Sequence, residues 1–110
     1  EAGFEYPTDA GRIDILARHK SRPEWLVVEL KKDQSTDRVI GQILRYMGWV
    51  KKNLASPGEE VKGLIISSDV DKNLQYALAV FPPGYIRIMR YRIQLFLEPV
   101  EFDDKKNTIV

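Results

Sequence analysis

The stretch VVELKKDQSTDRVIGQILRYMGWV, residues 27–50, constrains the fold more than any other part of the chain. The run WLVVELK at 25–31 is almost continuously apolar before its charged end, which is typical of a buried, central strand. Ser, Thr and Asp at 35–37 can each cap the N-terminus of a helix, and apolar residues then recur at helical spacing over 39–54. A buried strand followed by an amphipathic helix predicts an α/β fold.

Shorter patterns complete the order β-β-β-α-β-α-β(-β), which is an α/β arrangement with a mixed sheet. Alternating or apolar runs predict the strands, and capping residues followed by helical spacing predict the helices. We expect one domain over residues 1–100 and a loosely held tail over 101–110. The expected strands lie at 4–6, 12–19, 25–31, 61–68 and, in one or two pieces, 85–100, and the expected helices lie at 36–54 and 69–81.

Composition limits the classes of protein that remain open. The chain has 110 residues and no cysteine, which excludes a disulfide scaffold and thiolate metal sites and fits a reducing cytoplasm. No apolar run is long enough to span a bilayer, so we expect no membrane partner. The net charge of +1 does not by itself indicate nucleic acid, although basic residues crowd between Lys31 and Lys52. Taken alone, that cluster is more typical of a solvated face.

Two acidic residues are expected to meet on the hairpin formed by RIDILARH and WLVVELK. If the turn centres on residues 21–22, Asp14 faces Glu29. The same register makes Arg12 face Lys31. Directly opposed side chains lie about 5 Å apart at Cβ, and two like charges there destabilise a sheet unless a cation lies between them. Mg²⁺, which prefers a few carboxylate oxygens and water, is the natural candidate. A slip of one residue would turn Asp14 to the opposite face.

A lysine is expected beside this pair. Glu29 and Lys31 share one face because strand side chains alternate, while Leu30 points into the core and its backbone carbonyl stays near the metal position. A metal-held water next to an ammonium group is a suitable nucleophile for attack on phosphorus, because the metal lowers the pKa of the water and the lysine orients or deprotonates it. Taken separately, Asp14 is typical of a turn carboxylate, and Glu29 with Lys31 is typical of an exposed ion pair.

Gln42 and Tyr46 lie one turn apart on the expected helix, away from its apolar stripe. Gln42 can order the attacking water or the lysine. Tyr46, Arg45 and Arg38 can contact backbone phosphates, which proteins bind largely through such side chains. Taken alone, the pattern is also that of a polar helix edge with a tyrosine whose hydroxyl reaches solvent. The apolar stripe consists of Ile40, Ile43, Met47 and Val50.

The remaining residues that could carry chemistry have structural interpretations. His19, the only histidine, is expected on the surface of a turn rather than as a ligand. Trp25 and Trp49 are expected in the core or at its edge rather than as platforms for base stacking. The acids of DVD at 69–71 are expected to cap a helix, because the spacing of a calcium loop is missing.

Three segments in this order resemble the PD-(D/E)xK nuclease superfamily: GRIDILA at 11–17, VVELK at 27–31 and GQILRYMGWV at 41–50. The Q-x-x-x-Y pattern on the helix is similar to one branch of it, and the chain most resembles the catalytic domain of NucS/EndoMS-type DNA endonucleases. The resemblance covers residues 4–97 and implies a restriction-endonuclease-like mixed β-sheet flanked by helices. The superfamily core begins with a helix before its first strand, and we expect this chain to lack that helix because its first strand comes almost at once.

The resemblance gives each candidate residue a role. It implies that Asp14 and Glu29 hold Mg²⁺ or Mn²⁺, to which the Leu30 carbonyl is added by its position, and that Lys31 assists the water. It also implies that Gln42 and Tyr46 complete the site and that hydrolysis leaves a 5′-phosphate. The residues expected to contact DNA are Arg12, Lys32, Arg38 and Arg45.

We therefore expect a metal-dependent endonuclease domain that hydrolyses phosphodiester bonds in branched, mismatched or single-stranded DNA and acts in DNA repair in the cytoplasm. The alternative is a catalytically inactive nuclease-like module that binds nucleic acid or a partner protein, which the low net charge favours. A third hypothesis is an accessory domain of a restriction or defence protein. NucS-like proteins carry a separate N-terminal domain for DNA binding and dimerisation, so a homodimer or a larger multidomain protein is the expected setting.

Overall fold

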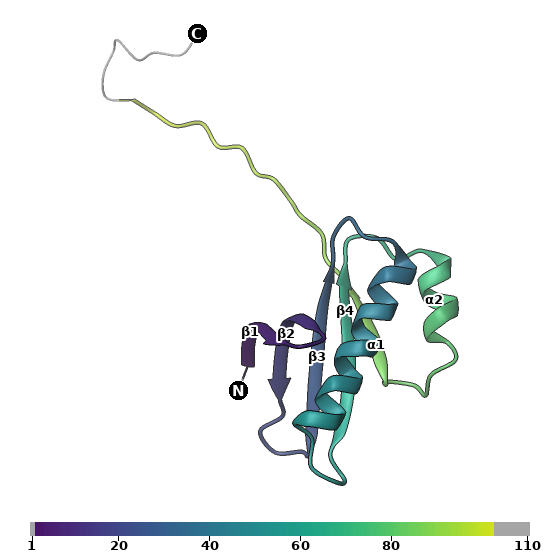
Figure 1. Ribbon diagram of the computed structural model, residues 1–110. Coiled ribbons are helices and arrows are strands. Elements are labelled where there is room, and N and C mark those ends of the chain that lie inside the picture. Colours follow the sequence, from purple (N-terminus) through teal and green to yellow (C-terminus); the bar gives the residue numbers. More distant parts are fainter. Residues whose placement is uncertain (1, 103–110) are drawn as a thin grey trace.

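A five-stranded mixed sheet forms the body of the computed structural model, which describes residues 2–102 (Figure 1). Neighbouring strands follow in sequence order, with β1, β2 and β3 antiparallel and β3, β4 and β5 parallel. The predicted order of elements is confirmed, and most of the predicted tail at 101–110 lies outside the described residues. The elements are β1 (Ala2–Thr8), β2 (Gly11–Arg18), β3 (Glu24–Lys31), α1 (Thr36–Asn53), β4 (Glu60–Ser67), α2 (Lys72–Leu78) and β5 (Ile86–Arg90).

Helix α1 covers one face of β3 and β4, and α2 packs beside it (Figure 1). The N-terminus of α1 is capped by Ser35, one of the three capping candidates at 35–37, and its side chain accepts a hydrogen bond from the Arg38 N–H. The approach to β4 is close: a Cβ added at Gly63 would lie 2.9 Å from both Ile43 Cδ1 and Met47 Sδ. Among the described residues, neither helix has the combined length and apolar character that crossing a bilayer requires.

Strand β2 departs from the regular alternation that the sequence predicted. Regular alternation would place Ile15 and Ala17 on the face of Ile13, yet the buried residues of β2 are Ile13 and Leu16, three positions apart. Both belong to the core cluster under α1. The alternation therefore breaks between them, at the point where the ladder from β2 to β3 ends.

The C-terminal part of the chain holds less regular structure than the patterns predicted. Helix α2 is shorter than the expected 69–81 and begins after Asp71, whose side chain accepts the Leu74 N–H and the Thr36 hydroxyl. After β5, the Tyr91 N–H still donates to the Ser67 carbonyl, but 91–102 form no second strand and run away from the sheet (Figure 1).

Candidate active site

The register of the β2–β3 hairpin places Asp14 beside Glu29. The pairs run from Arg18 with Trp25 to Ile15 with Val28, which confirms the register assumed from the sequence. The predicted pair of Arg12 with Lys31 does not form, because the ladder between β2 and β3 ends at Ile15. Asp14 and Glu29 are thus the first residues beyond the paired part of the hairpin, where the two strands separate.

Each carboxylate accepts a hydrogen bond from the backbone of the opposite strand. The Leu30 N–H donates to Asp14 Oδ2 at 2.8 Å, and the Asp14 N–H donates to Glu29 Oε1 at 3.4 Å. Asp14 is half-buried, whereas Glu29 is only 3% exposed. The separation of the strands therefore gives the two carboxylates room to lie side by side at the edge of the core.

The closeness of the two carboxylates disfavours the charged form of Glu29. Burial, followed by the negative charge of Asp14, raises the pKa of Glu29 from 4.5 to about 8. The backbone N–H of Asp14 and the charge of Lys32 offset only part of that shift in pKa. A buried carboxyl whose pKa is raised by a neighbouring acid marks a candidate functional site, because a bound cation would remove the conflict.

The donor atoms at this point match the preferences of a hard divalent cation. Asp14 and Glu29 offer carboxylate oxygens, and the adjacent Leu30 carbonyl accepts a long hydrogen bond, 3.4 Å, from Gln34 Nε2. Mg²⁺ is bound through one or two carboxylates and keeps several waters, so two acids suffice for it. Within residues 2–102 no group of three or more acidic, histidine or cysteine side chains is placed to hold a metal ion. The donor set thus fits Mg²⁺ or Mn²⁺ and not an ion that demands an all-protein cage.

Two lysines follow Glu29, and they act on different carboxylates. Lys31 ends β3 beside Ser67 and is half-buried. The pKa of Asp71 is lowered by the Leu74 N–H, then by the Thr36 hydroxyl, and also by the charge of Lys31. Lys32 is exposed, and its charge is the one that lowers the pKa of Glu29. From the sequence, Lys32 was predicted only to contact DNA, and its effect on Glu29 was missed. The one signal of that effect is the position of Lys32 next to the ExK pattern.

Tyr46 differs most from its expected position. It was placed on a polar helix face, but it is 6% exposed and belongs to the core cluster. Gly11, at φ 125°, lies against its hydroxyl so closely that an added Cβ would sit 2.6 Å from Oη. The Arg45 guanidinium lies 5.9 Å from the ring centroid. Tyr46 therefore joins α1 to the start of the strand that carries Asp14.

The other candidate residues on α1 lie nearer the surface. Gln42 is half-buried one turn before Tyr46, and Arg38 and Arg45 are exposed. Trp49, expected at the edge of the core, is half-buried there and donates its Nε1–H to Asp9. The two arginines thus face solvent on the helix that packs over β3, where a phosphate chain could reach them.

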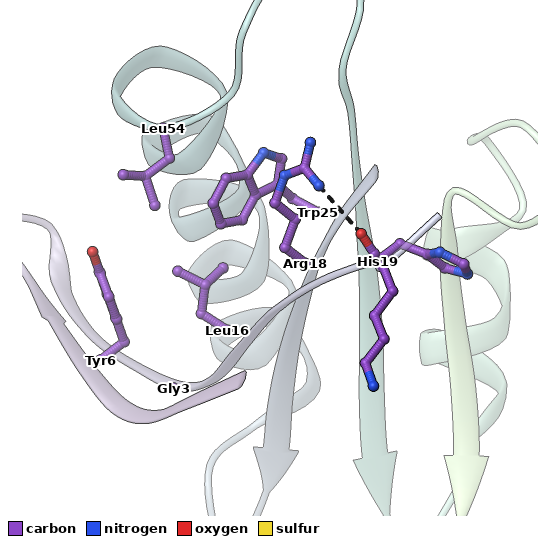
Figure 2. Close-up of a pocket in the computed structure, with 8 residues that line it drawn as sticks. Gly3, Tyr6, Leu16, Arg18, His19, Trp25 and Leu54 are labelled. Atoms are coloured by element: carbon purple, nitrogen blue, oxygen red, sulfur yellow. Dashed lines mark hydrogen bonds between the residues drawn. The ribbon is translucent and has the colours of Figure 1, made fainter. Parts of the chain in front are cut away.

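The opposite end of the hairpin holds a cavity of about 420 Å³ with a different character (Figure 2). Tyr6 lies on one side of it, and Trp25 with Arg18 on the other, above Leu16 (Figure 2). The Arg18 guanidinium lies 5.7 Å from the Trp25 ring centroid and pairs with Glu59, which also accepts the Trp25 Nε1–H. Arg18 and Glu59 therefore neutralise each other at this end of the hairpin.

His19 has a structural role that the sequence analysis did not predict. It lies in the β2–β3 turn as expected, but its Nδ1 accepts the backbone N–H groups of Ser21 and Arg22, each at 3.1 Å. The histidine thus fixes the turn that sets the register of the hairpin. Its sequence position gave no signal of this, because any polar residue could occupy an exposed turn.

Comparison with known proteins relates the chain to endonucleases. The family model described as the endonuclease NucS C-terminal domain matches residues 2–79, a range that includes every candidate site residue. Over 108 aligned residues, the chain is 25% identical to the endonuclease NucS of Methanocaldococcus jannaschii, covering 86% of this chain and 40% of that protein.

The fold is similar to that of a repair endonuclease from Pyrococcus abyssi known from a crystal structure. The TM-score is 0.62 at 18% sequence identity, and the match covers 81% of this chain and 36% of that one. The chain therefore spans only about two fifths of the length of these relatives.

Proposed function

This chain belongs to the endonuclease NucS C-terminal domain family, and we propose that it is a metal-dependent endonuclease domain of the PD-(D/E)xK type that hydrolyses DNA phosphodiester bonds. The observation that carries the proposal is the meeting of Asp14 with a buried Glu29 whose pKa is raised to about 8. Two adjacent carboxylates destabilise a fold unless a cation lies between them, so their closeness supports a cation site.

The residues divide into ligands and positioning groups. Asp14, Glu29 and the Leu30 carbonyl would hold Mg²⁺ or Mn²⁺. When bound, such an ion lowers the pKa of a water and neutralises phosphate charge. The Leu30 N–H fixes the Asp14 carboxylate, so its second oxygen remains available. Tyr46 acts through Gly11, by holding the strand that bears Asp14 against α1.

The remaining polar residues would handle water and DNA. Lys31, on the face of Glu29, orients or deprotonates the attacking water, and Gln42 orders it. The bulk of the affinity for DNA would come from contacts to phosphates, which do not depend on sequence. The residues assigned to phosphates are Arg12, Lys32, Arg38 and Arg45, all of which are exposed.

The proposal is tested by incubating the chain with branched, mismatched and single-stranded DNA in Mg²⁺, Mn²⁺ or EDTA. We expect cutting with either metal, none in EDTA, and a large loss in Lys31→Ala. Glu60→Gln, an exposed position at the other end of the sheet, is the matched control and should cut like the parent chain. Cutting in EDTA, or cutting that Lys31→Ala retains, would refute the mechanism.

A second candidate is binding without catalysis. It is favoured by one observation: the described influence of Lys31 is on Asp71, not on the carboxylate pair. Under this alternative, DNA affinity would fall steeply with salt and depend on Arg38 and Arg45, but not on Asp14 or on added metal. Measuring DNA binding of Asp14→Asn and Arg45→Ala across a salt series, with and without Mg²⁺, separates the two candidates.

A further inference from the structure

Glu5, in the middle of β1, has a backbone conformation that is foreign to a strand. Its φ is 48°, and among the described residues it is the one residue other than glycine whose φ is positive. Left-handed backbone is unfavourable for a residue with a long side chain. It persists only where the surrounding structure enforces it, and such residues cluster at functional sites.

Glu5 lies directly across the β1–β2 ladder from Asp14. The pairs on either side of these two residues keep one register and are Phe4 with Ile15 and Tyr6 with Ile13. Between the first and the last pair of this ladder, Glu5 and Asp14 are the opposed residues that do not pair. The left-handed residue of β1 and the acidic residue of the candidate site therefore share one interruption of the sheet.

Both strands change the face that they present at this interruption. On β2, Ile13 and Leu16 are both buried in the core. On β1, a Cβ added at Gly3 would lie 3.2 Å from Tyr6 Cδ2, and both residues line the same cavity as Leu16 (Figure 2). Residues three apart share one face of a strand only where the alternation of side chains is broken between them. The alternation is thus broken on both strands, around the residues that do not pair.

The change of face places the Asp14 carboxylate between two strands. In a regular continuation of the β2–β3 ladder, Ile13 would lie opposite Leu30 and its carbonyl would accept the Leu30 N–H. Asp14 Oδ2 accepts that N–H instead, at 2.8 Å. Backbone N–H groups of a strand point along the sheet towards the neighbouring strand. The carboxylate that accepts this one therefore lies at the level of the sheet, beside Glu29, whose Oε1 accepts the Asp14 N–H.

We propose that the left-handed backbone of Glu5 positions the Asp14 carboxylate, which makes Glu5 a positioning residue of the candidate cation site. The inference rests on the proposed function, because it concerns the same site. If Glu5 became extended, regular alternation along β1 and β2 would carry the Asp14 side chain to one face of the sheet. The Glu5 side chain is exposed, so the effect belongs to its backbone and not to its carboxylate.

Substitutions that differ in the φ they allow test the proposal on the whole chain. Glu5→Pro fixes φ at about −65° and so excludes the observed conformation. In a calorimetric titration with Mn²⁺, its affinity should fall on the order of tenfold, as when a residue that orients a metal ligand is lost. Glu5→Gly, which allows positive φ without a steric penalty, should bind Mn²⁺ like the parent chain.

Two controls separate the backbone of Glu5 from its side chain and from its surroundings. Glu5→Gln removes the charge and keeps a long, unbranched side chain. Phe4→Val changes the neighbouring side chain, which is 74% exposed, at a position that pairs normally with β2. Both variants should bind Mn²⁺ like the parent chain.

Hydrogen exchange of the Leu30 amide gives a second measurement that needs no metal. Because this N–H is bound to Asp14, it should exchange on the order of tenfold faster in Glu5→Pro than in the parent chain or Glu5→Gly. The amides of β4 should keep their protection, which shows that the variant is folded. If the proline variant does not fold, Glu5→Val takes its place in both measurements, since a β-branched residue strongly disfavours positive φ.

Parent-like Mn²⁺ affinity together with parent-like Leu30 exchange in the folded proline or valine variant would overturn the inference. Equal losses in Glu5→Gly and Glu5→Pro would also overturn it, because they would assign the effect to the glutamate side chain. A parent chain that binds no Mn²⁺ would contradict the proposed function instead, and the exchange of the Leu30 amide would still decide whether Glu5 positions Asp14.

Discussion

At the two ends of the β2–β3 hairpin, the pKa of a glutamate is shifted in opposite directions. At the turn end, the Ser56 N–H, then the Trp25 Nε1–H and then Arg18 lower the pKa of Glu59 to about 2. At the open end, burial and then Asp14 raise the pKa of Glu29 to about 8. The first carboxylate is surrounded by donors and stabilises the turn, whereas the second is held against another acid. The difference supports the proposal that the open end, and not the turn end, binds a cation.

The largest effect that would sharpen this comparison is on activity. Asp14→Asn should lower metal-dependent DNA cleavage by more than the 10- to 100-fold typical of losing an outer-shell partner, because a direct metal ligand is lost. Glu59→Gln, a similar change at the other end, should leave the rate unchanged. Steady-state cleavage assays in Mg²⁺ check both. Equal losses in the two variants would show that the ends do not differ in function.

The next largest effect concerns the contact that holds the open end to α1. Gly11→Ala should reduce the free energy of unfolding by about 3 kcal/mol, because the added Cβ meets Tyr46 Oη in a backbone conformation that favours glycine. Gly58→Ala is the control, since Gly58 also has positive φ but open space around it, and should cost only about 1 kcal/mol of backbone strain. Urea denaturation measures both. Equal costs would mean that the Gly11–Tyr46 contact does not matter.

A smaller effect, on stability, has opposite signs at the two ends. Because the folded pKa of Glu29 lies above its unfolded value, the metal-free protein should lose stability as pH rises from about 4.5 to about 8. Glu29→Gln should remove that slope and stabilise the metal-free chain at neutral pH by on the order of 2 kcal/mol. Glu59, whose pKa is lowered, stabilises the fold above its unfolded pKa, and this contribution is lost as pH falls towards 2.

Thermal unfolding across this pH range checks these signs. Glu59→Gln should lower the midpoint at neutral pH, while Glu29→Gln raises it. A Glu29→Gln chain that is less stable than the parent at neutral pH would contradict the account of the open end.

The smallest expected effect is at the turn. His19→Ala should cost about 1 kcal/mol, because two backbone N–H groups lose their acceptor but can turn to water. His19→Asn, which keeps an acceptor near the backbone, should cost less. Both are measured by denaturation. If neither variant changes stability, the His19 contacts do not fix the turn.

Sequence alone predicted what depends on local patterns. The start of α1 within 35–37, the length of α1 and the hairpin register could all be predicted, because capping, helical spacing and turn position are local. The break in the β2–β3 ladder beyond Ile15 could not be predicted, and neither could the packing of Gly11 at the start of β2 against Tyr46 of α1, because both are long-range features. The same packing buries Tyr46, whose polar group made it look like a surface residue.

Contacts between residues far apart in the chain could not be predicted from the sequence either. Glu59 meets Trp25 and Arg18 only because β4 returns beside β3, and nothing in the residues around Glu59 indicates this contact. The second strand predicted within 85–100 has strand periodicity but no strand beside it in the described residues, which periodicity cannot reveal.

Calorimetric titration with Mn²⁺ at neutral pH tests the central claim most directly, because it needs neither DNA nor a particular substrate. The parent chain and Glu59→Gln should each bind one ion, and Asp14→Asn should show no binding heat. Equal binding by the parent and Asp14→Asn, or no binding by the parent chain, would contradict the claim that Asp14 and Glu29 form a cation site.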